Sequence, residues 1–153
     1  MSQIKKINHI AIVVEDIDQA LAFWQDTLGI QLGGQQDNPN EEAQVAFLPV
    51  GESEIELVLP TSANSGVAKF LSKHGAGLHH ICLEVEDLDG LLLRLKNKNV
   101  RLISEEPRLN HQGQRYIFIH PESTFGVLVE LYEENKTDSP ILQKTPKVSL
   151  RDI

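Results

Sequence analysis

Apolar and other side chains alternate at the start of the chain, and the period then changes to that of a helix. Three apolar residues share one face of the first extended segment, because successive side chains of a strand point to opposite faces: Ile10, Ile12 and Val14. The other face begins with His9 and continues with small residues. The pattern predicts a strand over residues 8–14, followed by a helix that begins at an acidic N-cap, Asp16 or Asp18, and ends at Gly29.

Shorter alternating runs fill the rest of the first half. Residues 30–32 predict a short strand, and the polar segment 33–42 predicts a loop. Two alternating runs on either side of a Gly-Glu-Ser turn predict a hairpin of strands, 44–50 and 54–60. In the second of these strands, Glu56 lies on the face opposite to three apolar residues. The first half is therefore predicted to be β–α–β–β–β.

The second half repeats this order of elements. In the connecting segment, 61–76, Ser65 is placed to cap a short helix that ends at Gly75. The predicted elements that follow are a strand over 80–85, a leucine-rich helix over 88–95, a strand over 100–104, a polar loop over 105–114, and strands over 115–120 and 127–132.

The two halves also share an internal sequence repeat. Shifting the chain by 71 residues superposes His9 on His80, and six of the ten positions that start at His9 are then identical. A repeat of this kind indicates two packed copies of one supersecondary unit. We expect an α+β fold in which two paired βαβββ modules, residues 5–60 and 77–133, form a curved mixed sheet that lines a cleft, with the helices outside.

Length and composition fit a single domain over residues 1–133 with a C-terminal tail, 134–153. The chain has a net charge of −8 and no basic stripe, which argues against nucleic-acid binding. Its apolar runs are shorter than the roughly 18 residues that cross a membrane. The single cysteine, Cys82, cannot form an internal disulfide, and a small buried role is expected for it. We therefore expect a cytoplasmic protein that does not bind membranes and whose partner is a small molecule or another protein.

One histidine and one glutamate occupy matched positions in each half. Glu56 and Glu130 lie in similar strand contexts, Ile-Glu-Leu and Val-Glu-Leu, so the repeat relates them as it relates His9 and His80. Alone, such a histidine is most often structural and such a glutamate most often solvated. Their matched recurrence favours a shared site for a divalent cation such as Co, Zn, Mn or Ni. His79 should face away from His80, in a structural or supporting role.

Several segments together resemble a known family. They are Asn8-His-Ile-Ala-Ile-Val-Val, Glu56-Leu-Val-Leu-Pro, Val67-Ala-Lys-Phe-Leu, Gly77-Leu-His-His-Ile-Cys-Leu-Glu-Val, Glu105-Glu-Pro-Arg, His120-Pro and Gly126-Val-Leu-Val-Glu-Leu. On these segments the chain resembles the vicinal-oxygen-chelate (glyoxalase/bleomycin-resistance) superfamily, and more closely its methylmalonyl-CoA epimerase branch. The resemblance covers about residues 5–133.

The resemblance implies a function for the four matched residues. His9, Glu56, His80 and Glu130 would hold a divalent cation, and the protein would interconvert the two C2 epimers of methylmalonyl-CoA through a metal-stabilised enolate. The partner would then be an acyl-CoA or related thioester, and a homodimer is expected. Glu130 is the candidate catalytic base, and the second proton-transfer group is unassigned. Some family members carry a glutamate in the strand that corresponds to 44–48, where this chain has no carboxylate.

Two other functions fit the same residues. A glyoxalase I-like lyase that acts on a hemithioacetal would use the same two-histidine, two-glutamate set, so the ligands do not separate the two enzymes. A non-catalytic small-molecule binding member of the superfamily would share the fold, although such proteins typically lack the complete ligand set. A ring-cleaving dioxygenase is less favoured, because its triad of two histidines and one carboxylate leaves more open metal positions.

Overall fold

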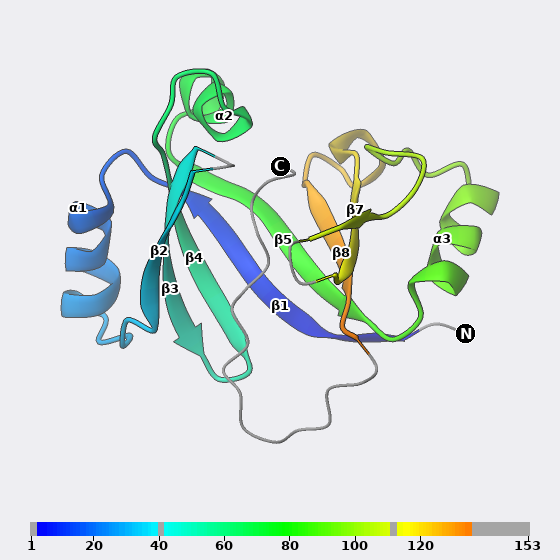
Figure 1. Cartoon of the computed structure of the whole chain (residues 1–153), viewed down its shortest axis with the longest axis horizontal. Coiled ribbons are helices and arrows are strands. Elements are labelled where there is room, and N and C mark those ends of the chain that lie inside the picture. The colour runs from blue at the N-terminus through cyan, green and yellow to red at the C-terminus, as the bar shows by residue number, and fades with distance from the viewer. Residues whose placement is uncertain (1–2, 40–41, 111–112, 136–153) are drawn as a thin grey trace. The chain divides into compact units, whose positions relative to one another are not determined.

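The computed structural model describes residues 3–39, 42–110 and 113–135 (Figure 1), so the predicted tail lies outside the described residues from 136 onward. The strands are β1 (Ile4–Val13), β2 (Gly34–Asn38), β3 (Ala43–Val50), β4 (Ser53–Pro60), β5 (Gly77–Val85), β6 (Arg108–Leu109), β7 (Arg115–Ile119) and β8 (Val129–Glu133). The helical segments are α1 (Ile17–Leu21), the π-helical η1 (Ala22–Thr27), α2 (Gly66–His74), α3 (Leu88–Asn97) and the 3₁₀ turn η2 (Pro121–Ser123). This order of elements confirms two β–α–β–β–β runs joined by a helix.

The strands form a mixed sheet, which confirms the predicted α+β class. They are hydrogen-bonded in the order β2-β3-β4-β1-β5-β8-β7-β6. Strand β1 pairs with β4 in parallel, whereas β3 and β4 form an antiparallel hairpin, and so do β7 and β8. In the part of the chain that the structure describes, no helix is long and apolar enough to span a membrane.

The chain divides into two compact units. Their described residues are 8–81 in one, called here the N-terminal unit, and 3–7 with 82–135 in the other, called the C-terminal unit. Strands β1 and β5 each contribute residues to both units.

The helical segment that follows β1 begins where the sequence predicts. Asp16 has extended backbone angles and its Oδ1 accepts a hydrogen bond of 2.9 Å from the Gln19 amide, which makes it the N-cap. The segment ends before Gly29, whose φ of +81° lies in the left-handed region that glycine adopts readily. Ile12 and Val14 pack with residues of this segment, including Ile17, as the alternation of β1 predicts.

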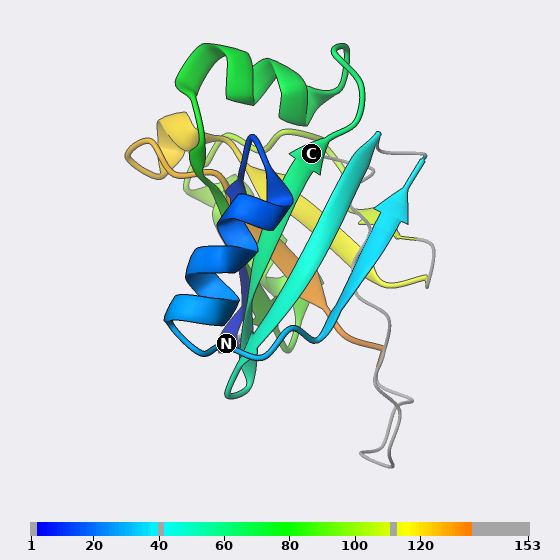
Figure 2. The same cartoon turned by 90° about the vertical axis from the view of Figure 1, so that its left-hand side faces the viewer.

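Strand β2 corrects the predicted loop. Residues 30–32 are not a strand; Ile30 and Leu32 pack against the core beside α1 instead. The strand lies in the polar segment at Gly34–Asn38 and pairs antiparallel with β3 (Figure 2). Strand β2 is at the edge of the sheet, so it pairs with β3 alone and need not bury one of its faces. Its sequence can therefore lack the alternation of apolar and polar residues that marks a half-buried strand.

Helix α2 packs on the face of the N-terminal unit to which His9 and Glu56 also belong. Its residues Val67, Phe70 and Leu71 contact a cluster of small apolar side chains from three strands: Ala11, Val13, Ala43, Val45 and Val58. Ser65 is the N-cap, and its Oγ accepts a hydrogen bond of 3.1 Å from the Ala68 amide, as predicted.

Replacing Ser65 with alanine should lower the free energy of unfolding by about 1 kcal/mol, because the Ala68 amide loses its capping acceptor. Thermal and urea unfolding followed by circular dichroism would measure the change. The matched control is Ser72→Ala, since Ser72 is an exposed residue of the same helix. Equal stability of the two variants would contradict a capping role for Ser65.

The C-terminal unit has its core between α3 and one face of β7 and β8. Leu88, Leu91 and Leu92 pack against Ile117 and Leu131, and the Asp87 side chain caps the helix through the Gly90 amide at 3.0 Å. The leucine pattern of the sequence therefore predicts this helix and its buried face correctly.

Two predicted segments of this unit differ in the structure. Residues 100–104 form no strand: Leu102 makes a single bridge to Ile119, so only one rung of a ladder is present. The predicted loop 105–114 contains the two-residue strand β6. Beyond this strand, the Gln114 amide donates a hydrogen bond of 2.9 Å to Asn110 Oδ1.

Candidate functional site

Three of the four predicted metal ligands lie together in the N-terminal unit. His9 is on β1, Glu56 on β4 and His80 on β5, and their exposed fractions are 2%, 1% and 0%. The parallel register of β1 and β4 places Ala11 opposite Glu56 and His9 opposite Glu54. Alternation along β1 and β4 therefore directs His9 and Glu56 to one face, His80 contacts His9 from β5, and the fold buries all three side chains.

The two histidines face each other through their Nε2 atoms. These atoms are 3.0 Å apart, and the two rings meet edge to face with centroids 5.2 Å apart. The Oε1 atom of Glu56 is 3.7 Å from Nδ1 of His9, which is beyond hydrogen-bond distance. A buried carboxylate next to two imidazoles is a common environment for a transition-metal ion.

The residues before the two histidines hold the other side of each ring. Asn8 Oδ1 is 2.9 Å from Nδ1 of His9, and His79 Nδ1 is 2.8 Å from Nδ1 of His80. Each Nδ1 atom thus contacts a neighbouring protein side chain, whereas the two Nε2 atoms face each other.

This arrangement fits a divalent cation. Two nitrogens that bind one ion at about 2.1 Å are about 3.0 Å apart at an octahedral angle of about 90° and about 3.4 Å apart at a tetrahedral angle. The observed Nε2 separation of 3.0 Å has the octahedral value. Glu56 lies on the adjacent strand with Oε1 3.7 Å from Nδ1 of His9, so these three buried side chains offer two imidazole nitrogens and one carboxylate as candidate donors.

The fourth predicted ligand, Glu130, lies in the C-terminal unit. It is on β8, opposite Phe118 of β7, and its exposed fraction is 2%. Its neighbour Leu131 belongs to the core under α3, so Glu130 points to the other face of the strand pair. Glu130, which the sequence predicts as a ligand, is therefore a buried carboxylate in the structure.

Tyr132 shares this face of β8 with Glu130. Burial raises the pKa of its hydroxyl, and the negative charges of Glu134 and Glu84 raise it further. The hydroxyl therefore stays protonated at neutral pH and can donate a hydrogen bond. Cys82 is fully buried, as the sequence predicts.

Two details of the N-terminal unit go beyond the sequence pattern. Alternation places Glu54 on the same face as Glu56, two residues earlier in the strand, but it does not indicate that Glu54 is buried, at 8% exposed. His79 is predicted to face away from His80 in a structural or supporting role, yet its Nδ1 atom lies 2.8 Å from Nδ1 of His80. Sequence pattern carries no information on how the rings rotate.

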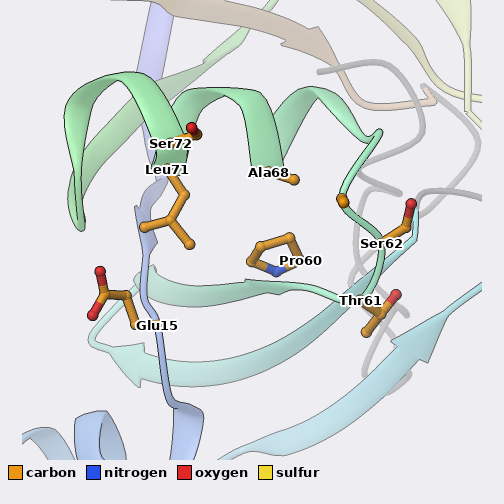
Figure 3. A pocket seen from close by; sticks show the side chains of 8 residues that line it. Glu15, Pro60, Thr61, Ser62, Ala68, Leu71 and Ser72 are labelled. Carbon is orange, nitrogen blue, oxygen red and sulfur yellow. The ribbon is translucent and has the colours of Figure 1, made fainter.

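A surface pocket of about 610 Å³ opens elsewhere in the same unit (Figure 3). Its lining comes from the segment after β1, the end of β4, the segment that follows β4, and the helix α2: Glu15, Pro60, Thr61, Ser62, Ala63, Ala68, Leu71 and Ser72. None of the predicted ligands lines this pocket.

Comparisons with known proteins place the chain in a family. Residues 8–118 match the model of the glyoxalase/bleomycin resistance protein/dioxygenase superfamily. The chain is 41% identical over 130 residues to ethylmalonyl-CoA/methylmalonyl-CoA epimerase of Cereibacter sphaeroides, a match that covers 84% of this chain and 97% of that one.

Solved structures agree with this assignment. The crystal structure of methylmalonyl-CoA epimerase from Mycobacterium tuberculosis is 35% identical with a TM-score of 0.75, covering 86% of this chain and 89% of that one. A methylmalonyl-CoA epimerase in complex with methylmalonyl-CoA and NH4+ is 33% identical with a TM-score of 0.77, and the match covers 90% of this chain and 100% of that one. The chain belongs to the glyoxalase/bleomycin resistance protein/dioxygenase superfamily and, within it, to the methylmalonyl-CoA epimerase family.

Proposed function

We propose that this protein epimerises methylmalonyl-CoA at C2. The observation that carries the proposal is the buried pair His9 and His80, with facing Nε2 atoms beside Glu56, in a chain that belongs to the epimerase family. The relative from Cereibacter sphaeroides is named for ethylmalonyl-CoA as well, so we include a larger alkyl group at C2 among the candidate substrates.

The proposed ligands are His9, Glu56, His80 and Glu130. Together they offer two neutral nitrogens and two carboxylate oxygens, a set suited to Co, Zn, Mn or Ni. A divalent cation bound there would act as a Lewis acid that stabilises negative charge on the thioester oxygen as the C2 proton leaves. Burial of the side chains excludes water, and this strengthens each electrostatic interaction in the site.

The protein must also move a proton. Carbon C2 lies between a thioester and a carboxylate, so removal of its proton gives a planar enolate, and return of a proton to the opposite face inverts the centre. We propose Glu130 as one proton-transfer group, because it is a carboxylate held on a rigid strand and shielded from water. The cytoplasmic location stays a prediction from the sequence, and the homodimer stays a prediction from the family resemblance.

The direct test is exchange of the C2 proton with solvent. Metal-loaded protein incubated with methylmalonyl-CoA in deuterated water should incorporate deuterium at C2 at an enzymatic rate, and prior treatment with a chelator should remove the activity. Mass spectrometry of the acyl-CoA would measure the exchange, and ethylmalonyl-CoA would be tested in parallel. Exchange no faster than in the chelated sample would overturn the proposal.

A second assay separates the epimerase from a glyoxalase I-like lyase. The same metal-loaded protein should not convert the hemithioacetal of methylglyoxal and a thiol. The loss of the hemithioacetal would be followed by ultraviolet absorbance. Turnover of this substrate without C2 exchange would favour the lyase.

A further inference from the structure

The repeat relates more than the two ligand histidines. A shift of 71 residues that superposes His9 on His80 also superposes Asn8 on His79. In both halves the earlier residue contacts Nδ1 of the histidine that follows it, at 2.9 Å for Asn8 and 2.8 Å for His79. All four residues belong to the N-terminal unit. The same contact to Nδ1 therefore occurs in both halves, made by an asparagine in the first and by a histidine in the second.

The chemistry of imidazole determines what these contacts can do. A neutral ring carries one hydrogen, on Nδ1 or on Nε2, and a nitrogen that binds a metal must offer its lone pair. A ring that binds through Nε2 therefore carries its hydrogen on Nδ1. Asn8 Oδ1 can only accept a hydrogen bond, so it selects the Nδ1–H form of His9.

His79 can select the same form of His80 in only one way. Nδ1 of His79 must accept the hydrogen from Nδ1 of His80, so His79 must carry its own hydrogen on Nε2. Helix α2 restrains the ring of His79, because the ring of Phe70 packs edge to face against it with the ring centroids 4.7 Å apart. The ring of Phe70 also packs against the ring of His74 on the next turn of the helix, with the ring centroids 4.8 Å apart.

We propose that Asn8 and His79 are positioning residues that hold His9 and His80 in the Nδ1–H form, so that both Nε2 lone pairs are available to one divalent cation. The inference rests on the metal site of the proposed function. Partners of this kind typically change metal affinity by about 10- to 100-fold when they are lost. The connecting helix α2, through Phe70, holds the second partner in place.

The repeat supplies matched variants for the test. His79→Leu removes the acceptor and should weaken Zn²⁺ binding about 10- to 100-fold, whereas His79→Asn copies the residue of the other half and should restore most of the affinity. Asn8→Leu should weaken binding by a similar factor, and Asn8→Asp, which keeps an acceptor oxygen, should not. Competition with a chromogenic chelator measures each affinity, and circular dichroism identifies any variant that has not folded.

Nitrogen-15 NMR of the Zn²⁺-loaded protein gives a readout independent of activity. His79 should carry its hydrogen on Nε2, and His80 should carry a slowly exchanging hydrogen on Nδ1. The inference is overturned if His79 carries its hydrogen on Nδ1, if the leucine variants bind Zn²⁺ like the unchanged protein, or if the unchanged protein binds no Zn²⁺. Failure of C2 exchange in a protein that binds Zn²⁺ overturns the epimerase proposal alone.

Discussion

Replacing His80 with alanine should remove the bound divalent cation and lower the rate of C2 proton exchange by about a thousandfold or more. The charge stabilisation that a bound cation supplies is worth several kcal/mol, and about 4 kcal/mol corresponds to a factor of about 10³ in rate. His80 is fully buried, with Nε2 3.0 Å from Nε2 of His9, so alanine at this position removes one of the two facing imidazole nitrogens. Elemental analysis of the purified variant and the deuterium exchange assay would measure the two effects.

The control for this variant is another histidine of the same unit. His74 is an exposed residue of α2 whose ring contacts Phe70, and His74→Ala should keep both the metal and most of the activity. Both variants should show native far-ultraviolet circular dichroism. Unchanged metal stoichiometry in His80→Ala would refute the ligand role of His80.

The predictions from sequence succeeded where one residue has one physical task. Asp16 and Ser65 are N-caps in the structure because a short oxygen-bearing side chain before an apolar helical run has few other uses. The two faces of β1 followed from strand alternation: Ile12 and Val14 pack beside α1, and His9 is buried on the face that carries α2.

The predictions failed where the partner of a segment determines its structure. The polar sequence of β2 gives no strand signal, and the segment is extended because β3 offers it a free edge. Residues 100–104 have strand-like sequence, yet Leu102 forms only one bridge. Pairing of this kind depends on tertiary contacts that the local pattern does not contain.

The candidate site shows the same division. Matched positions in the repeat predict His9, Glu56 and His80 as ligands, and the structure buries all three side chains, but their role as ligands stays a prediction. The rotation of the rings decides which nitrogen faces the metal space, and it depends on Asn8 and His79. A sequence names these neighbours but does not show their contacts with the rings.

Replacing Glu130 with glutamine should lower the rate of C2 exchange by about 10²- to 10⁴-fold, because the amide has a similar shape but cannot accept the C2 proton. Glu56→Gln is the matched comparison. Glu56 is equally buried and is also a proposed ligand, but it has no proposed part in proton transfer. An amide oxygen can still bind a cation, so we expect a smaller loss of activity in this variant. Metal content and exchange rate would be measured for both variants at equal metal loading. Equal losses would mean that the two glutamates act only as ligands, whereas a selective loss in Glu130→Gln would identify the carboxylate of β8 as a proton-transfer group.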